Sequence, residues 1–167
     1  AIVEFPGVLY RGGAEQKIRK YLVDNNYVDT IIQLPPDLFF GTSIATCVVV
    51  LKKSKKDNKV LFIDASSEFV REGNKNKLSE SNRKRILDAF IQREDIEYFT
   101  KLVDNKDIGE NGYNISVSNY VVQEDKREVI DIKVLNKEIE EIVKRENELR
   151  RDIDEIVREL EGGGGYV

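Results

Sequence analysis

Two neighbouring stretches of the chain have the hydrophobic pattern of strands that are covered on both faces. Residues 27–34 and 45–51 are rich in β-branched and apolar side chains and show little alternation with polar positions. Such runs are typical of strands inside a sheet that is packed on both sides. About ten residues separate the two runs, far more than a tight hairpin needs. The pattern therefore predicts two strands joined by a long loop.

The surrounding pattern predicts an α/β sheet with mixed strand directions. Strand patterns are expected at residues 1–5, 27–34, 45–51 and 60–64. A helix over 14–25 joins the first two, and this strand–helix–strand order indicates parallel pairing. The third strand is expected to return antiparallel beside the second. In the helix, Ile18, Tyr21 and Leu22 form the apolar stripe, and Arg19 is expected on the solvent side.

The second half of this region is less regular. Ser79 and its neighbours offer N-caps for a helix to about residue 93, with Ile86, Leu87, Phe90 and Ile91 on one face. The remaining segments are expected to be loop at 64–77, helical turn or strand at 96–103, turn at 105–112, and short strand or extended arm at 113–122.

From Ile132 onward the pattern becomes that of a coiled coil. Apolar residues recur in alternating steps of four and three, interrupted only by Glu146. The seam consists of Leu135, Ile139, Ile142, Leu149, Ile153, Ile156 and Leu160. A stripe this narrow suits pairing with one or two helices, so a partner is expected. That partner is either another chain or this chain's own α/β domain, and both interpretations stay open.

These changes of pattern define four regions. Residues 1–122 form the α/β domain, 123–131 a charged linker, 132–160 the coiled-coil helix, and 161–167 a glycine-rich flexible tail.

Composition narrows the chemistry. The chain has 167 residues, 27 Lys and Arg against 31 Asp and Glu, and no histidine. The net charge of -4 argues against nucleic-acid binding by bulk electrostatics. Without histidine, histidine-based triads and most zinc sites are excluded, and we expect no metal site. The single cysteine, Cys47, indicates a reducing, cytoplasmic compartment.

Two further features bear on the extent of the chain. No apolar run has the length of a membrane span, so no membrane association is expected. The chain contains no methionine and begins inside a strand pattern. We therefore expect a fragment of a longer protein.

The loop between residues 34 and 45 carries the candidate chemistry. Phe39 and Phe40 lie near its tip and are either a binding feature or ordinary core side chains. Leu34-Pro35-Pro36-Asp37 superficially matches the Asn/Asp/Ser-Pro-Pro-aromatic motif of amino-methyltransferases. That chemistry needs a hydrogen-bond acceptor first and an aromatic ring fourth, and Leu34 and Asp37 supply neither. We reject this match.

Four segments together resemble a known family. They are FPGVLYRGGAEQKIRKYLVDNNYVDTIIQLPPDLFFGTSIATCVVVLKK, VLFIDASSEF, GNKNKLSESNRKRILDAF and ENGYNISVSNYV, followed by an acidic linker and a coiled-coil helix. In this order they closely resemble the C-terminal half of the modification (methyltransferase) subunits of type I restriction-modification systems. The resemblance covers residues 1 to about 160, and LFFGTSIATC and the GNKNKLSE/YNISVSNYV pair are its most specific pieces.

The resemblance implies a fold and an activity. The fold is the C-terminal part of a class I, Rossmann-like S-adenosylmethionine-dependent methyltransferase sheet, with strand seven antiparallel between strands five and six. The family transfers a methyl group from S-adenosylmethionine to N6 of adenine in DNA. Its cofactor loop and catalytic motif lie upstream of Ala1. The resemblance thus implies no catalytic residue, no bound cofactor and no activity in this chain alone.

It also implies roles for particular residues. Phe39, with Phe40 as substitute, would stack on the extruded target base, and Gly41 and Thr42 would shape the loop. The seam would dock on the specificity subunit, in a complex with the restriction subunit and double-stranded DNA. Self-association through the helix stays open. The alternative functions are a non-catalytic interaction module presenting the helix, and a stand-alone methyltransferase with another adenine-containing substrate.

Overall fold

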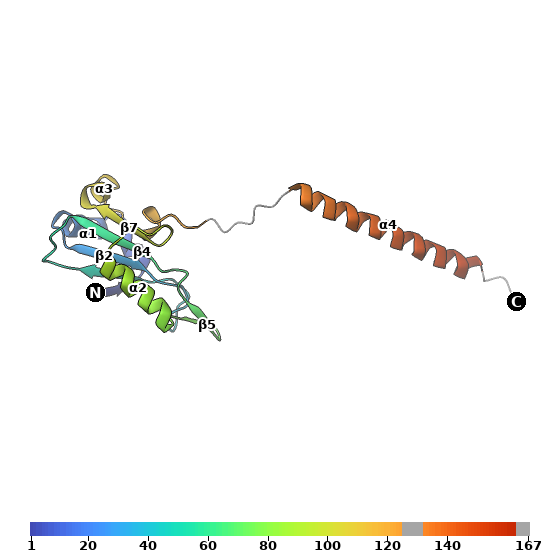
Figure 1. Ribbon diagram of the computed structural model, residues 1–167, viewed down its shortest axis with the longest axis horizontal. Coiled ribbons are helices and arrows are strands. Elements are labelled where there is room, and N and C mark those ends of the chain that lie inside the picture. Colours follow the sequence, from blue (N-terminus) through green and yellow to red (C-terminus); the bar gives the residue numbers. More distant parts are fainter. Residues whose placement is uncertain (125–131, 163–167) are drawn as a thin grey trace. The chain divides into compact units, whose positions relative to one another are not determined.

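The computed structural model describes residues 1–124 and 132–162, which fall into two units (Figure 1). The first unit, Ala1–Glu124, is an α/β unit, and the second contains one long helix, α4 (Ile132–Gly162). The helix includes Glu161 and Gly162, which the sequence assigned to the tail. Most of the expected linker and the rest of the tail lie outside the described residues. None of the described helices combines the length and apolar composition needed to cross a bilayer.

The α/β unit is built from seven short strands and several helical segments. In chain order these are β1 (Ile2–Glu4), the 3-10 turn η1 (Pro6–Leu9), α1 (Ala14–Asp24), β2 (Val28–Gln33), β3 (Cys47–Leu51), β4 (Lys59–Asp64), β5 (Val70–Glu72), β6 (Lys75–Lys77), α2 (Glu80–Gln92), β7 (Thr100–Asp104), α3 (Asn105–Glu110) and the 3-10 turn η2 (Val117–Asn119).

Five strands form one mixed sheet in the order β1-β3-β2-β4-β7. β3 is antiparallel to both β1 and β2, β4 is parallel to β2, and β7 is antiparallel to β4. β1 and β2 therefore run in the same direction, but β3 lies between them and they do not pair directly. The strand–helix–strand pattern indicated parallel pairing, and the two strands are parallel in direction although they do not pair with each other. The antiparallel return of β3 beside β2 is confirmed.

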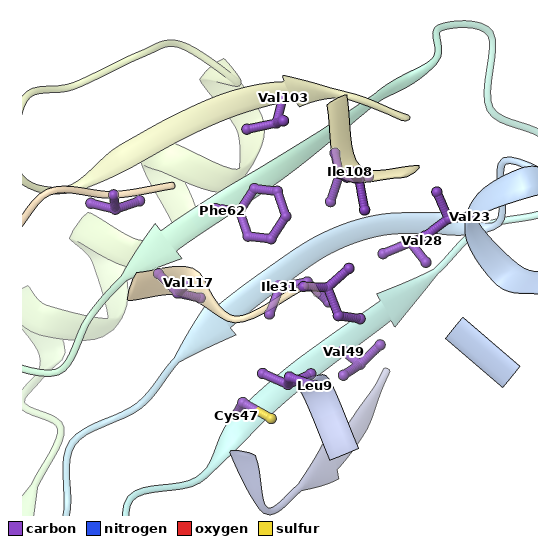
Figure 2. Close-up of a cluster of buried hydrophobic side chains, with 13 residues drawn as sticks. Leu9, Val23, Val28, Ile31, Cys47, Val49, Phe62, Val103, Ile108 and Val117 are labelled. Atoms are coloured by element: carbon purple, nitrogen blue, oxygen red, sulfur yellow. The ribbon is translucent and has the colours of Figure 1, made fainter. Parts of the chain in front are cut away.

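Each face of the sheet has its own apolar core. Figure 2 shows the first core, where Ile31, Phe62 and Val49 meet side chains of the α1, α3 and η2 regions. The Phe62 and Tyr120 rings pack with their centroids 4.3 Å apart. The second core, on the face covered by α2, includes Leu61 and Ile63. Residues of β2 and β4 contribute to both cores, which explains their unbroken apolar pattern.

Helix α2 begins as the sequence predicts and packs less fully than expected. Ser79 and Asn82 form a reciprocal capping box at its start. Ile86 and Phe90 pack against the second core, whereas Leu87 and Ile91 are 54% and 66% exposed.

Helix α1 corrects the expected assignment of faces. Ile18 and Tyr21 are each 59% exposed, while Arg19 is only 4% exposed. The Arg19 guanidinium donates hydrogen bonds to the backbone oxygens of Tyr113, Val8 and Arg11 at 2.7–2.8 Å. Arg19 can be buried because each of its three side-chain nitrogens donates to a backbone carbonyl group, which offsets the loss of water. Burial also lowers the pKa of its guanidinium.

Three further expectations are corrected. The expected loop at 64–77 contains the β5–β6 hairpin, and the expected turn at 105–112 contains helix α3. Residues 113–122 form no strand, and the 3-10 turn η2 interrupts this segment. The ambiguous segment 96–103 contributes to strand β7.

Candidate functional site

The long loop between β2 and β3 leaves the sheet at the edge where open α/β sheets commonly bind ligands. β2 and β4 run parallel, so Gln33 and Asp64 end their strands side by side at the same edge. The backbone N–H of Leu34 donates to the Thr46 oxygen at 2.8 Å and closes the base of the loop. Pro35 is buried just beyond this bond, so the loop starts from a fixed point.

The two aromatic residues of this loop are displayed to solvent. Phe39 is 42% exposed and Phe40 is 97% exposed. The alternative that they are core side chains is therefore wrong for this chain. An exposed aromatic pair at this edge of the sheet offers a flat apolar surface to a binding partner.

Gly41 and Thr42 set the path of the chain after the aromatic pair. Gly41 has a φ of 78°, in the left-handed region that favours glycine. The Thr42 hydroxyl accepts a hydrogen bond from the backbone N–H of Ile44 at 3.0 Å, which forms a local turn. These features are compatible with the loop-shaping role predicted for Gly41 and Thr42, which stays a prediction.

The β5–β6 hairpin holds this loop from the side. Asn76 donates from its side chain to the Pro36 oxygen at 2.8 Å and from its backbone to the Asp37 oxygen at 3.1 Å. The Lys75 ammonium donates to the backbone oxygens of Phe39 at 3.1 Å and Thr42 at 3.3 Å. The hairpin therefore contacts the loop on both sides of the aromatic pair.

An ion pair completes this contact. The Arg71 guanidinium lies 3.3 Å from the Asp37 carboxylate and donates to the Asn76 side-chain oxygen at 3.1 Å. Arg71, Lys75 and Asn76 were not predicted as site residues. The only signal for them in the sequence was the position of Lys75 and Asn76 within the GNKNKLSE segment that carries the family resemblance.

Cys47, at the start of β3, is close to the loop, but its thiol is expected to be unreactive. Burial raises the pKa of its thiol to about 11, and the thiol donates to the Glu4 backbone oxygen at 3.4 Å. A thiol that stays protonated at neutral pH is a poor nucleophile. Within residues 1–124 and 132–162, no three His, Cys, Asp or Glu side chains are grouped so that they could hold a metal ion.

The second candidate site is the seam of α4. On this helix, considered by itself, every residue of the seam is between 45% and 74% exposed, namely Leu135, Ile139, Ile142, Leu149, Ile153, Ile156 and Leu160. Glu146, which interrupts the seam, pairs with Arg150 at 3.2 Å. The helix thus carries an apolar stripe with one polar break, the pattern of a helix that pairs with other helices.

The chain matches known proteins over most of its length. The N-6 DNA methylase family matches residues 1–129. The chain is 49% identical over 161 residues to the type I restriction enzyme MpnII methylase subunit of Mycoplasma pneumoniae, covering 96% of this chain and 30% of that protein. The chain thus spans about a third of the length of such relatives.

Two solved structures extend the comparison. The type I restriction-modification methyltransferase subunit of Streptococcus thermophilus is 45% identical, with a TM-score of 0.70 over 72% of this chain and 26% of that one. A chain from a structure of type I system assembly and conformational transition is 16% identical, with a TM-score of 0.55 over 98% of this chain and 36% of that one, and shows the shared fold alone.

The chain belongs to the N-6 DNA methylase family. The resemblance to type I restriction-modification methylase subunits is confirmed, as is the mixed α/β fold with a long C-terminal helix. The position of β3 between β1 and β2 is the one implied for strand seven of the methyltransferase sheet.

Proposed function

We propose that this chain works as the target-base-contacting part of a type I restriction-modification methylase subunit. The intact subunit would transfer a methyl group from S-adenosylmethionine to N6 of adenine in double-stranded DNA. Support comes from the family match, the 49% identity to a type I methylase subunit and the displayed aromatic loop. Whole-subunit activity is part of this proposal, because the chain spans 30% of that relative.

The exposure of Phe39 carries the proposal. An adenine must leave the DNA stack before a methyl group can reach its N6, and the extruded base needs a surface to replace its lost stacking. Phe39 supplies such a surface at the carboxyl edge of β2, and Gly41 and Thr42 shape the loop around it. Stacking on an aromatic side chain contributes about 1–3 kcal/mol per base.

The cofactor is assigned to residues outside this chain. S-adenosylmethionine supplies the methyl group when bound, but the printed sequence has neither a glycine-rich loop after a buried strand nor an Asn-Pro-Pro-aromatic motif. Gly12 and Gly13 precede α1 but follow the turn η1 rather than a strand. We therefore assign no catalytic or cofactor-binding residue here, and we expect the chain alone to be inactive.

The helix α4 is proposed as the contact with a partner subunit. Its exposed seam fits a helix of the specificity subunit, within a complex that also holds the restriction subunit and DNA. The division into an α/β part at 1–122, a linker at 123–131 and a coiled-coil helix at 132–160 stays a prediction, and the structure extends that helix to Gly162.

The test is Phe39→Ala in the intact methylase subunit assembled with its partners. We expect kcat/KM for methylation of a DNA duplex to fall about 5- to 150-fold, the equivalent of one lost stack. Assembly, followed by size-exclusion chromatography, should be unchanged because Phe39 lies far along the chain from α4. Phe40→Ala should have a smaller effect.

Two results would count against this proposal. Unchanged methylation by the Phe39 variant would remove that residue from the site. A larger loss in the Phe40 variant would transfer the stacking role to Phe40. If neither aromatic matters, the interaction-module interpretation, which the exposed seam of α4 favours, would take precedence.

A further inference from the structure

We propose that Asn76 is a positioning residue for methyl transfer, which holds the β2–β3 loop so that Phe39 faces the target base. This inference rests on the proposed function and adds a residue that the comparisons do not assign. Asn76 lies in β6 and is only 6% exposed, so it does not reach DNA itself.

The Asn76 side chain uses both ends of its amide. Its nitrogen donates to the Pro36 oxygen at 2.8 Å, and its oxygen accepts from Arg71 at 3.1 Å. Its backbone N–H adds a bond to the Asp37 oxygen at 3.1 Å. An aspartate would keep the acceptor but lose the donor, and an apolar residue would lose both.

Lys75, the preceding residue, extends this hold to the aromatic pair. Its ammonium donates to the Phe39 and Thr42 carbonyl oxygens at 3.1 and 3.3 Å, on either side of Phe40 and Gly41. The main chain of Phe39 is therefore bonded directly, which fixes the point from which its side chain leaves the loop.

The hairpin is itself held in place, because the chain is fixed by hydrogen bonds before it, at Glu68, and after it, at Asn82. Glu68, just beyond β4, is 7% exposed, and its carboxylate accepts from Asn82 at 3.0 Å and from Arg85. Asn82 also belongs to the capping box that starts α2. The two ends of the segment that contains the hairpin are thus joined to each other, because the buried carboxylate of Glu68 at its start bonds to Asn82 at its end.

The conformation of the loop is one that folding alone does not favour. Asp37 has a φ of 55°, in the left-handed region, and Phe40 is almost fully exposed. Left-handed backbone at a non-glycine residue and displayed apolar rings are both unfavourable, and polar contacts from the hairpin offset them. A loop fixed in advance binds without losing further freedom of motion.

The experiment compares Asn76→Asp with Asn74→Asp in the assembled methylase. Both changes introduce the same charge into the same hairpin, but Asn74 lies exposed at the turn. We expect Asn76→Asp to lower kcat/KM about 5- to 10-fold, the value of about one lost hydrogen bond, and Asn74→Asp to leave it unchanged. Lys75→Ala removes the hydrogen bonds to the Phe39 and Thr42 carbonyl oxygens and should also lower kcat/KM, whereas Lys77→Ala is its control and should not.

A double-mutant cycle separates positioning from a general effect on folding. If Asn76 acts through Phe39, Asn76→Asp should have no further effect in a Phe39→Ala background. Fluorescence of 2-aminopurine at the target position should report the same change, because Asn76→Asp should reduce its quenching by the Phe39 ring.

The outcomes distinguish this inference from the function it rests on. Equal losses in both backgrounds, or no loss from Asn76→Asp and Lys75→Ala, would overturn the positioning role and leave Phe39 in place. No loss from Phe39→Ala would overturn the base contact itself, and the role of Asn76 with it.

Discussion

The α/β unit and helix α4 use apolar residues in opposite ways. In the α/β unit, Phe62 and Ile31 are fully buried between the sheet and its helices. On α4, considered by itself, the seam residues Ile142 and Ile153 are 66% and 57% exposed. The same residue types thus stabilise the first unit internally and leave the second dependent on something outside it.

The difference explains how one chain combines a fixed site with an adaptable contact. The α/β unit gains its stability from area that it buries itself, so it can hold a loop in a defined conformation. The helix gains little until its seam is covered, because an isolated helix is marginal in water. Mutations in the two regions should therefore show up in different measurements.

The largest expected effect is on the stability of the α/β unit. Phe62→Ala should lower the free energy of unfolding by about 3–5 kcal/mol, because it empties a fully buried position beside Tyr120. Urea denaturation followed by circular dichroism measures this change. The matched change Phe40→Ala should alter the value by less than about 0.5 kcal/mol. Similar values for the two variants would contradict the distinction between buried and displayed rings.

The next largest effect is on binding through the exposed seam of α4. Ile153→Asp should weaken partner-subunit binding by about 2–4 kcal/mol, because it places a charge in an apolar seam. Isothermal titration calorimetry of the methylase subunit with its partner subunit measures this change in binding free energy. Arg151→Asp, on the opposite side of the helix, is the matched control. Retained binding by the Ile153 variant would remove the seam from the interface.

A smaller effect is expected from the N-cap of helix α2 in the α/β unit. Ser79→Ala should cost about 1 kcal/mol of unfolding free energy, since it removes the side-chain bond to the Asn82 N–H. Ser79→Asp retains a capping oxygen and should restore most of the loss. Equal loss in both variants would show that the cap contributes little to α2.

The last prediction concerns pH and is confined to alkaline solution. Burial raises the pKa of the Cys47 thiol to about 11, above its ordinary value in an unfolded chain. The folded state therefore favours the neutral thiol, and the resulting stability is present below the unfolded pKa and lost as pH rises towards 11. At pH 8 the native thiol should react with a disulfide reagent only as fast as the unit unfolds. Rapid labelling of the native chain would contradict burial of this strand.

Elements with strong patterns were predictable. The unbroken apolar character of β2 and β4 indicated strands packed on both faces, and Ser79 indicated the start of α2. The seam of α4 was visible from spacing alone. In each case local residue types and the final fold favour the same structure.

The missed features depend on contacts between distant segments. The β5–β6 hairpin has few apolar residues, and its contacts with Pro36 and Asp37 lie about 40 residues away in sequence. Arg19 was placed outside because it is charged, yet carbonyls from Val8, Arg11 and Tyr113 bury it. Sequence periodicity carries no information on such acceptors. The hydrogen bonds from Lys75 and Asn76 to the Phe39 loop could not be predicted for the same reason.

Strand β1 has a practical consequence for work with this chain. It ends the sheet, it is three residues long, and its Ile2 and Val3 are 48% and 54% exposed. An edge strand presents unpaired N–H and C=O groups to which a second copy could add a strand, but a strand of three residues allows few such hydrogen bonds. Edge-to-edge adhesion should therefore be weak and should appear only in concentrated solutions. A lysine in place of Val3 would act as a gatekeeper and raise the concentration that remains clear.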